Sequence, residues 1–76
     1  MNISFKMDAK NDVYLDFYTL NGNKLVRRLT LGEMSAGDHT VTWDGTNLHG
    51  TRVIGGIYLI RLHQGNEFMT VKLIML

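Results

Sequence analysis

The chain has 76 residues, no cysteine and a formal net charge of +1. This length accommodates one domain, residues 1–76, and leaves no room for an enzyme fold with a deep pocket beside its own core. Without cysteine, the domain must rely for its stability on packing alone or on a larger neighbour. Basic and acidic residues are interspersed, which predicts no nucleic-acid-binding face. The apolar runs are far shorter than the roughly 20 residues that a membrane span needs.

The N-terminal part of the chain predicts two amphipathic β-strands. In the first strand, Ile3, Phe5 and Met7 alternate with polar residues, which is the period of a half-buried strand. Residues 8–12 then form a turn, because their acidic side chains do not have the spacing of a calcium loop. In the second strand, the inward face is formed by Val13, Leu15 and Phe17. The outward face is formed by Tyr14, Asp16 and Tyr18.

A β-hairpin is expected next. The dipeptide Asn21-Gly22 is the strongest short-range hairpin signal, because both residues tolerate a positive φ. Residues 24–31 are the returning strand, in which Val26 lies on the side of Arg28 and the inward residues are Leu25, Leu29 and Leu31. Arg27 falls on the apolar side, so it either extends to the rim of the core or marks a β-bulge.

Residues 32–38 are small or polar and predict a loop, with a helical turn over residues 33–36 as an alternative. Residues 39–43 form a fourth strand, with Val41 and Trp43 facing inward. Trp43 is the largest apolar side chain, and we expect it to fill the core or close one end of a sandwich. The alternative is a tryptophan that stacks on a ligand.

The polar connection at residues 44–50 has the chemistry of turns. Asp44 can accept hydrogen bonds from the backbone that follows it, and Gly45 and Gly50 can adopt a positive φ without a steric clash. Asp44, Asn47 and His49 could alternatively bind a metal ion, but an Asp-Gly pair after a strand is more often a turn. Residues 51–54 are predicted to form a short edge strand.

Two apolar strands complete the pattern. Residues 57–63 carry apolar side chains on both faces, with Ile57 and Leu59 on one face and Tyr58, Ile60 and Leu62 on the other. This pattern predicts a central strand that is covered on both sides. Gly65-Asn66 turns the chain. Residues 67–76 have one apolar face, formed by Met69, Val71, Leu73 and Met75, while Ile74 and Leu76 add apolar surface to the other. Such a strand is available for pairing with another chain.

No constellation of residues in the sequence points to catalysis. The G-x-S-x-G context of a nucleophile is missing around both serines, Ser4 and Ser35. The histidines lie on different elements, at spacings unlike a helical zinc pair: His39, His49 and His63. An isopeptide crosslink would need a lysine, and the candidates are Lys6, Lys24 and Lys72. Nothing in the sequence indicates the buried acid that the crosslink also requires. We therefore predict no enzyme activity, no cofactor and no metal site.

Several motifs resemble one family of small modules. The stretch W-D-G-T-N-L-H-G-T-R-V-I-G-G-I-Y, residues 43–58, is similar to the signature of the immunoglobulin-like domain of flagellar hook-capping proteins. The same pattern closes secreted proteins that carry a type IX secretion C-terminal sorting domain. Further similarity lies in V-Y-L-D-F-Y-T-L-N-G-N-K-L-V-R-R-L at residues 13–29, S-A-G-D-H-T-V-T-W-D at residues 35–44 and G-I-Y-L-I-R-L-H-Q-G at residues 56–65. The resemblance thus covers nearly the whole chain.

Together, the strand pattern and the resemblance predict an all-β, immunoglobulin-like sandwich of six or seven antiparallel strands. The resemblance implies structural roles for its motif residues, which are Trp43, Asp44, Gly45, Gly50, Gly56 and Tyr58. As function it implies a C-terminal sorting or anchoring module of a larger bacterial protein, which is secreted or held at the cell surface.

The implied partner is a protein of the secretion machinery or the cell surface. It would recognise the last strand, at Lys72, Leu73, Ile74, Met75 and Leu76, and self-association through edge strands is a further expectation. One departure from the sorting family is the missing basic residue at the last position. The alternatives are a hook-cap module that packs against copies of its parent, and a structural or adhesion spacer. The place of the module in its open reading frame discriminates between sorting and hook-cap roles.

Overall fold

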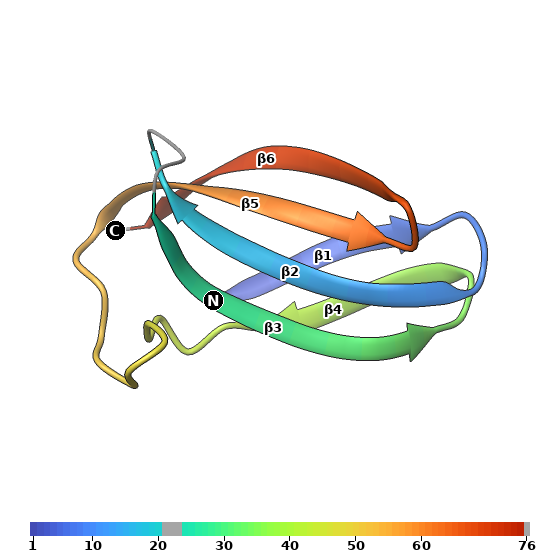
Figure 1. Cartoon of the computed structure of the whole chain (residues 1–76), viewed down its shortest axis with the longest axis horizontal. Coiled ribbons are helices and arrows are strands. Elements are labelled where there is room, and N and C mark those ends of the chain that lie inside the picture. The colour runs from blue at the N-terminus through green and yellow to red at the C-terminus, as the bar shows by residue number, and fades with distance from the viewer. Residues whose placement is uncertain (21–23, 76) are drawn as a thin grey trace.

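The computed structural model describes residues 1–20 and 24–75. Its described residues form six antiparallel strands in two sheets, which confirms the predicted all-β sandwich (Figure 1). The strands are β1 (Asn2–Met7), β2 (Asn11–Thr19), β3 (Leu25–Met34), β4 (Gly37–Thr42), β5 (Gly56–Gln64) and β6 (Glu67–Met75). One sheet has the order β3-β2-β5-β6, and the other pairs β1 with β4. The predicted hairpin at Asn21-Gly22 lies outside the described residues.

The core lies between the two sheets and follows the predicted alternation except at Leu25 and Val26 of β3. Eight hydrophobic side chains form the buried cluster: Met7, Val13, Leu15, Phe17, Val26, Trp43, Ile60 and Leu62. Trp43 follows β4 and is only 1% exposed. Its ring stacks on Phe17 with centroids 4.3 Å apart, and its indole N–H donates to the carbonyl of Thr46 at 3.0 Å. Trp43 is therefore part of the core, not a surface residue that could stack on a ligand.

A β-bulge in β3 reverses part of the predicted pattern. Phe17 pairs with Arg27, whereas the next residue of β2, Tyr18, pairs with Leu25, so Val26 is the extra residue. Val26 is buried in the core, and Leu25 is not packed against it, which is the opposite of the prediction for both side chains. An extra residue shifts the facing of its strand by one position, and periodicity alone does not show this.

Three further expectations about elements are wrong. Residues 32–34 belong to β3 and form neither a loop nor a helical turn, because Gly32, Glu33 and Met34 continue the pairing with β2. Residues 51–54 form only an isolated bridge between Thr46 and Arg52, not an edge strand. The second sheet covers only one face of β5, so the outer face is open to solvent and Ile57 is 39% exposed.

The hairpin between β5 and β6 has the predicted two-residue loop. Gln64 pairs with Glu67, and Gly65 between them has a φ of 59°. A glycine with positive φ at the first loop position suits the right-handed twist of the two strands. In the part of the chain that the structure describes, no helix is long and apolar enough to span a membrane.

Candidate functional site

The connection between β4 and β5 is built by the Asp44 turn. The Oδ1 atom of Asp44 accepts hydrogen bonds from the Thr46 hydroxyl at 2.6 Å and the Thr46 backbone N–H at 3.0 Å. These two hydrogen bonds, the side-chain one first, lower the pKa of Asp44 below its usual value. Gly45 has a φ of 78°, and its carbonyl accepts from the N–H of Val53 at 2.8 Å. The predicted turn chemistry is thus present at Asp44 and Gly45.

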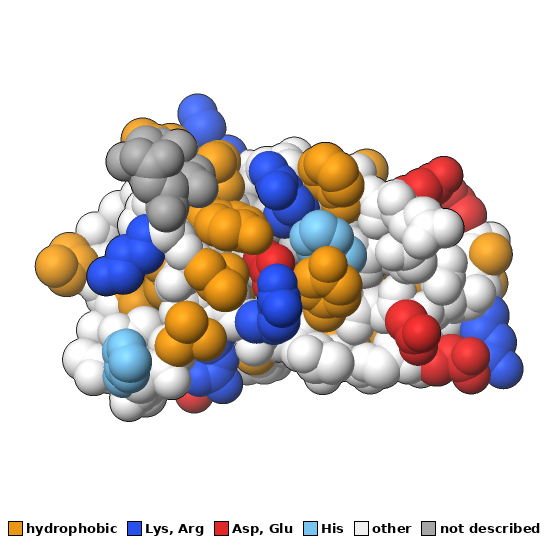
Figure 2. Space-filling model, in the orientation of Figure 1, with side chains coloured by type: hydrophobic (Ala, Val, Ile, Leu, Met, Phe, Trp, Pro, Cys, Tyr) orange, Lys and Arg blue, Asp and Glu red, His pale blue; other side chains and the backbone are white. Residues whose placement is uncertain are grey.

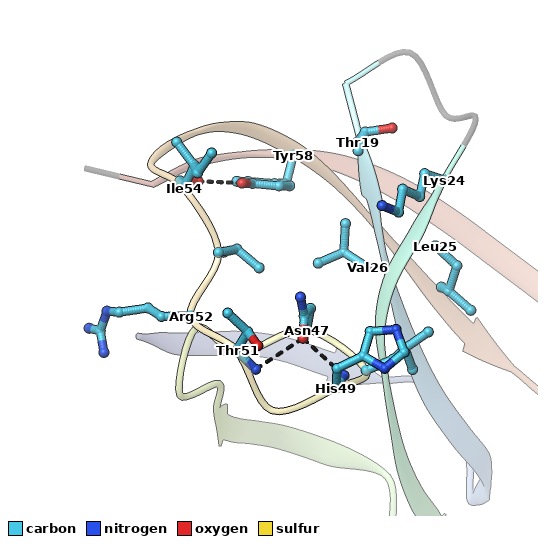
Figure 3. A pocket seen from close by; sticks show the side chains of 12 residues that line it. Thr19, Lys24, Leu25, Val26, Asn47, His49, Thr51, Arg52, Ile54 and Tyr58 are labelled. Atoms are coloured by element: carbon cyan, nitrogen blue, oxygen red, sulfur yellow. Dashed lines mark hydrogen bonds between the residues drawn. The ribbon is translucent and has the colours of Figure 1, made fainter.

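Asn47 organises the second half of this connection. Its side-chain oxygen accepts from the backbone N–H groups of His49 at 2.9 Å and Thr51 at 3.0 Å (Figure 3). Gly50 has a φ of 81° and donates its N–H to the Asn47 carbonyl at 3.1 Å. A metal ion at this site would need the side-chain oxygens of Asp44 and Asn47 as ligands. These oxygens instead accept hydrogen bonds from within the loop and so stabilise it. Among the described residues, no group of three or more histidine, cysteine or acidic residues could hold a metal ion.

A hollow of about 460 Å³ lies between this connection and the ends of β2 and β3. Val26, Val53 and Tyr58 contribute apolar walls, and the Tyr58 hydroxyl donates to the carbonyl of Ile54 (Figure 3). Lys24 and Arg52 also line the hollow, whereas its described lining includes no acidic residue. The motif residue Tyr58 thus supports the loop, and Gly56 begins β5 with a φ of 153°.

A buried carboxylate forms the centre of the outer face of the four-stranded sheet. Asp16 is 1% exposed, and both of its oxygens bind the guanidinium of Arg28, Oδ1 to Nε at 2.6 Å and Oδ2 to Nη2 at 2.8 Å. The Tyr18 hydroxyl donates to Oδ2 at 3.2 Å. Figure 2 shows a small acidic area in the middle of this view, with basic, histidine and hydrophobic side chains around it.

Arg28 determines the protonation of Asp16. Burial by itself would raise the pKa of Asp16, but the hydrogen bonds and the positive charge of Arg28 outweigh it, so the pKa lies below its usual value. The same contact raises the pKa of Arg28 further. The pKa of Tyr18 is raised by burial and then by the charge of Asp16. Asp16 is consequently ionised at neutral pH and holds Arg28 in place.

Aromatic rings extend this cluster across all four strands. Tyr14 of β2 stacks on His63 of β5 with centroids 4.1 Å apart, and His63 lies 5.6 Å from the Phe68 ring of β6. The guanidinium carbon of Arg28 lies 4.9 Å from the centroid of the Tyr14 ring. The cluster therefore joins charged and aromatic side chains into one surface.

Sequence reasoning placed Tyr14, Asp16 and Tyr18 on the outward face, but it did not foresee that Asp16 is buried. The signal was a lone acidic residue between two tyrosines, on a strand that is followed by Arg27-Arg28. Periodicity could not show which arginine would pair with Asp16, because the bulge at Val26 moves Arg28 into register with it.

The predicted partner-binding strand is β6, which pairs with β5 and lies at the edge of its sheet. Leu73 packs partly against the core, whereas Lys72 is exposed and Ile74 is 62% exposed. Met75 is the last residue of β6 and pairs with Gly56. Leu76 lies outside the described residues. Recognition of this strand by a partner remains a prediction.

The two-sheet arrangement and the closed loop define an immunoglobulin-like domain. The model of the FlgD Ig-like domain family matches residues 1–67, and the chain belongs to this family. This confirms the hook-capping part of the resemblance and does not support the type IX sorting part.

Individual FlgD proteins agree with this assignment. The basal-body rod modification proteins FlgD of Salmonella typhimurium strain LT2 and of Salmonella typhi are each 46% identical to the chain over 43 residues, which is 57% of this chain and 18% of theirs. The crystal structure of FlgD from P. aeruginosa superposes with a TM-score of 0.79 at 23% identity, over 93% of this chain and 57% of that one. At that identity the superposition shows a shared fold.

These relationships correct the predicted localisation. The resemblance to sorting domains predicts a secreted or cell-surface module, but the family match is to the FlgD Ig-like domain and the relatives are named basal-body rod modification proteins, so that localisation is wrong. The chain spans less than a fifth of the length of the Salmonella proteins that it matches. Its predicted place as the C-terminal module of a larger protein remains a prediction.

Proposed function

We propose that the chain is a non-catalytic, protein-binding module of a flagellar hook-assembly protein. The family match over residues 1–67 carries this proposal. The 46% identity to the Salmonella FlgD proteins supports it, because these proteins are named for modification of the basal-body rod. In this role the module packs against other protein subunits and does no chemistry on them.

The geometry suits a rigid docking module. The loop that contains the family motif satisfies its polar groups internally, through Asp44 and Asn47, so it holds its shape without a ligand. Trp43 joins this loop to the core through its hydrogen bond to Thr46. A rigid domain loses little conformational entropy when it binds, which favours its use in an ordered assembly.

Edge strands offer a second way to bind a partner. β3 and β6 lie at the two edges of the larger sheet, and unpaired backbone groups at an edge can pair with a strand of another chain. We include recognition at Lys72, Leu73, Ile74, Met75 and Leu76 in the proposal, together with self-association through these edges.

A domain exchange tests the proposed function. The Ig-like domain of Salmonella FlgD is replaced by this chain in a strain without its own FlgD, and hooks are counted by electron microscopy. We expect hooks to form. The matched control is an unrelated immunoglobulin-like domain of similar size in the same position, which should not support hook formation.

Two results would contradict the proposal. A chimera that is present at the normal level and forms no hooks would rule out an assembly role for this module. Equal numbers of hooks with the unrelated domain would leave only the spacer alternative, because any domain of that size would then serve.

A further inference from the structure

Two arginines flank one carboxylate on the outer face of the larger sheet, but only one of them binds it. Asp16 of β2 is in register with Arg28 on one neighbouring strand and with Arg61 on the other. Both oxygens of Asp16 are bound by Arg28, and Tyr18 takes a further position on Oδ2. Arg61 has no ion pair with any described residue. The row formed by Arg28, Asp16 and Arg61 therefore carries one positive charge that no described residue neutralises through an ion pair.

Arg61 is held in place by aromatic rings instead. Its guanidinium carbon lies 5.4 Å from the centroid of the Tyr18 ring and 4.8 Å from that of Phe68. Its Nε atom is buried and has no hydrogen-bond acceptor in the part of the chain that the structure describes. The same is true of Nε2 of His63, which lies 3.8 Å from Oδ2 of Asp16. A guanidinium that lacks a counter-ion among the described residues is prepared to receive an anion.

The surroundings of Arg61 have the composition of a protein interface. Phe68, whose ring lies against the Arg61 guanidinium, is 59% exposed on β6. Arginine and aromatic residues are enriched in protein interfaces and dominate their binding energy. Figure 2 shows basic, histidine and hydrophobic side chains close together in the middle of this view.

We propose that the outer face of the β3-β2-β5-β6 sheet docks an acidic segment of a partner protein, which brings a carboxylate to Arg61 and apolar side chains to Phe68. The proposal deepens the proposed function, on which its biological setting depends. The incoming carboxylate pairs with the Arg61 guanidinium and neutralises the positive charge that is left over among Arg28, Asp16 and Arg61.

Other occupants fit this face less well. A second copy of the chain would bring another outer face with the same uncompensated arginine, and like charges would oppose its approach. A nucleic acid would need a line of basic residues that follows the phosphates. Along the row through Asp16, Arg61 is the one described basic residue without an acidic partner.

The test uses a library of random short peptides displayed on phage, which is selected on the immobilised 76-residue chain. We expect the enriched peptides to carry Asp or Glu beside apolar residues. Their affinity should fall about tenfold or more in the Arg61→Gln variant, which loses a charge-assisted contact. Arg61→Lys should lie between the two, because it keeps the charge and loses the planar fork. The matched control is Arg52→Gln, which removes an exposed arginine from the β4–β5 connection and should leave affinity unchanged.

Each variant is first shown to melt like the parent chain, so that a loss of affinity is not a loss of fold. Enrichment of peptides without acidic residues, equal binding to Arg61→Gln, or no enrichment at all would overturn the proposal. Self-association of the chain in ultracentrifugation would also overturn the proposal if Arg61→Gln abolished it. The same holds for binding of an oligonucleotide, measured by fluorescence anisotropy. No flagellar protein is used, so this test can fail while the domain exchange succeeds, and the reverse.

Discussion

The Asp16→Asn substitution changes the centre of the outer face with almost no change in size. Asp16 is 1% exposed and accepts two hydrogen bonds from Arg28. Asparagine keeps one acceptor oxygen, but its amide nitrogen is a second donor that faces a donor of Arg28. One charge-assisted hydrogen bond, which contributes roughly 1.5–3 kcal/mol, is thereby lost. The smaller cost of burying a neutral group offsets part of this loss.

We therefore expect Asp16→Asn to lower the free energy of unfolding by about 2 kcal/mol at neutral pH. For a domain of this size, the melting temperature should fall by about 8–16 °C. Urea unfolding followed by the fluorescence of Trp43, the single tryptophan, measures the change. The matched control is Asp38→Asn, which removes an exposed carboxylate that forms no ion pair with a described residue and should have almost no effect.

The dependence on pH is the sharper part of this prediction. The pKa of Asp16 is lower in the folded chain than its usual value, because Arg28 outweighs the effect of burial. Such a carboxyl stabilises the fold above the unfolded pKa of about 3.9, and the stabilisation is lost as the pH falls through the folded pKa. The difference between parent and Asp16→Asn should be complete at about pH 7 and shrink below about pH 4. An equal difference at both values would refute the role given to the Asp16 carboxylate.

Three further substitutions test the packing. Arg28→Met leaves the carboxylate of Asp16 buried and unpaired, so the pKa of Asp16 should rise. The free energy of unfolding of this variant should then fall as the pH rises from about 4 to about 7, whereas ionised Asp16 stabilises the parent. If urea unfolding at a series of pH values gives the variant the same pH dependence as the parent, this expectation is wrong. Trp43→Ala should cost about 3–5 kcal/mol and abolish most of the near-ultraviolet circular dichroism, and melting within a few degrees of the parent would place the indole outside the core. Gly65→Val should speed hydrogen exchange in the β5–β6 hairpin, because Gly65 has a φ of 59° and an added Cβ would lie 2.4 Å from the Asn11 side chain of β2. The control substitution Gly55→Val should leave hydrogen exchange in this hairpin unchanged.

The features that could be predicted from the sequence are those that depend on local alternation. Val13, Leu15 and Phe17 are buried as their period of two indicates, and Gly65-Asn66 forms the turn that glycine at a positive φ allows. Each of these follows from two or three neighbouring residues, so no knowledge of the partner strand was needed.

The features that could not be predicted depend on how strands pair. Continuing the pairing of Tyr18 with Leu25 without interruption would place Asp16 opposite Arg27. The extra residue at Val26 instead brings Arg28 into register with Asp16, and so forms the buried ion pair. The His63 ring of β5 also lies beside Asp16, with Nε2 3.8 Å from Oδ2, and the sequence neighbours of Asp16 do not identify it. The outer face of the larger sheet thus depends on how several strands pair, and no single sequence motif defines it.

We propose that this module docks a protein during flagellar assembly with the outer face of its larger sheet. Thr70 lies on that face in register with Arg61, and Thr40 is exposed on β4 of the smaller sheet. A photo-crosslinking amino acid at either position, in the Salmonella chimera described above, reports what each face touches while hooks are being built.

We predict crosslinks to a flagellar protein from position 70, their loss with Arg61→Gln, and few or none from position 40. Hooks that form without a crosslink from position 70, or with crosslinks from position 40 alone, would contradict the account.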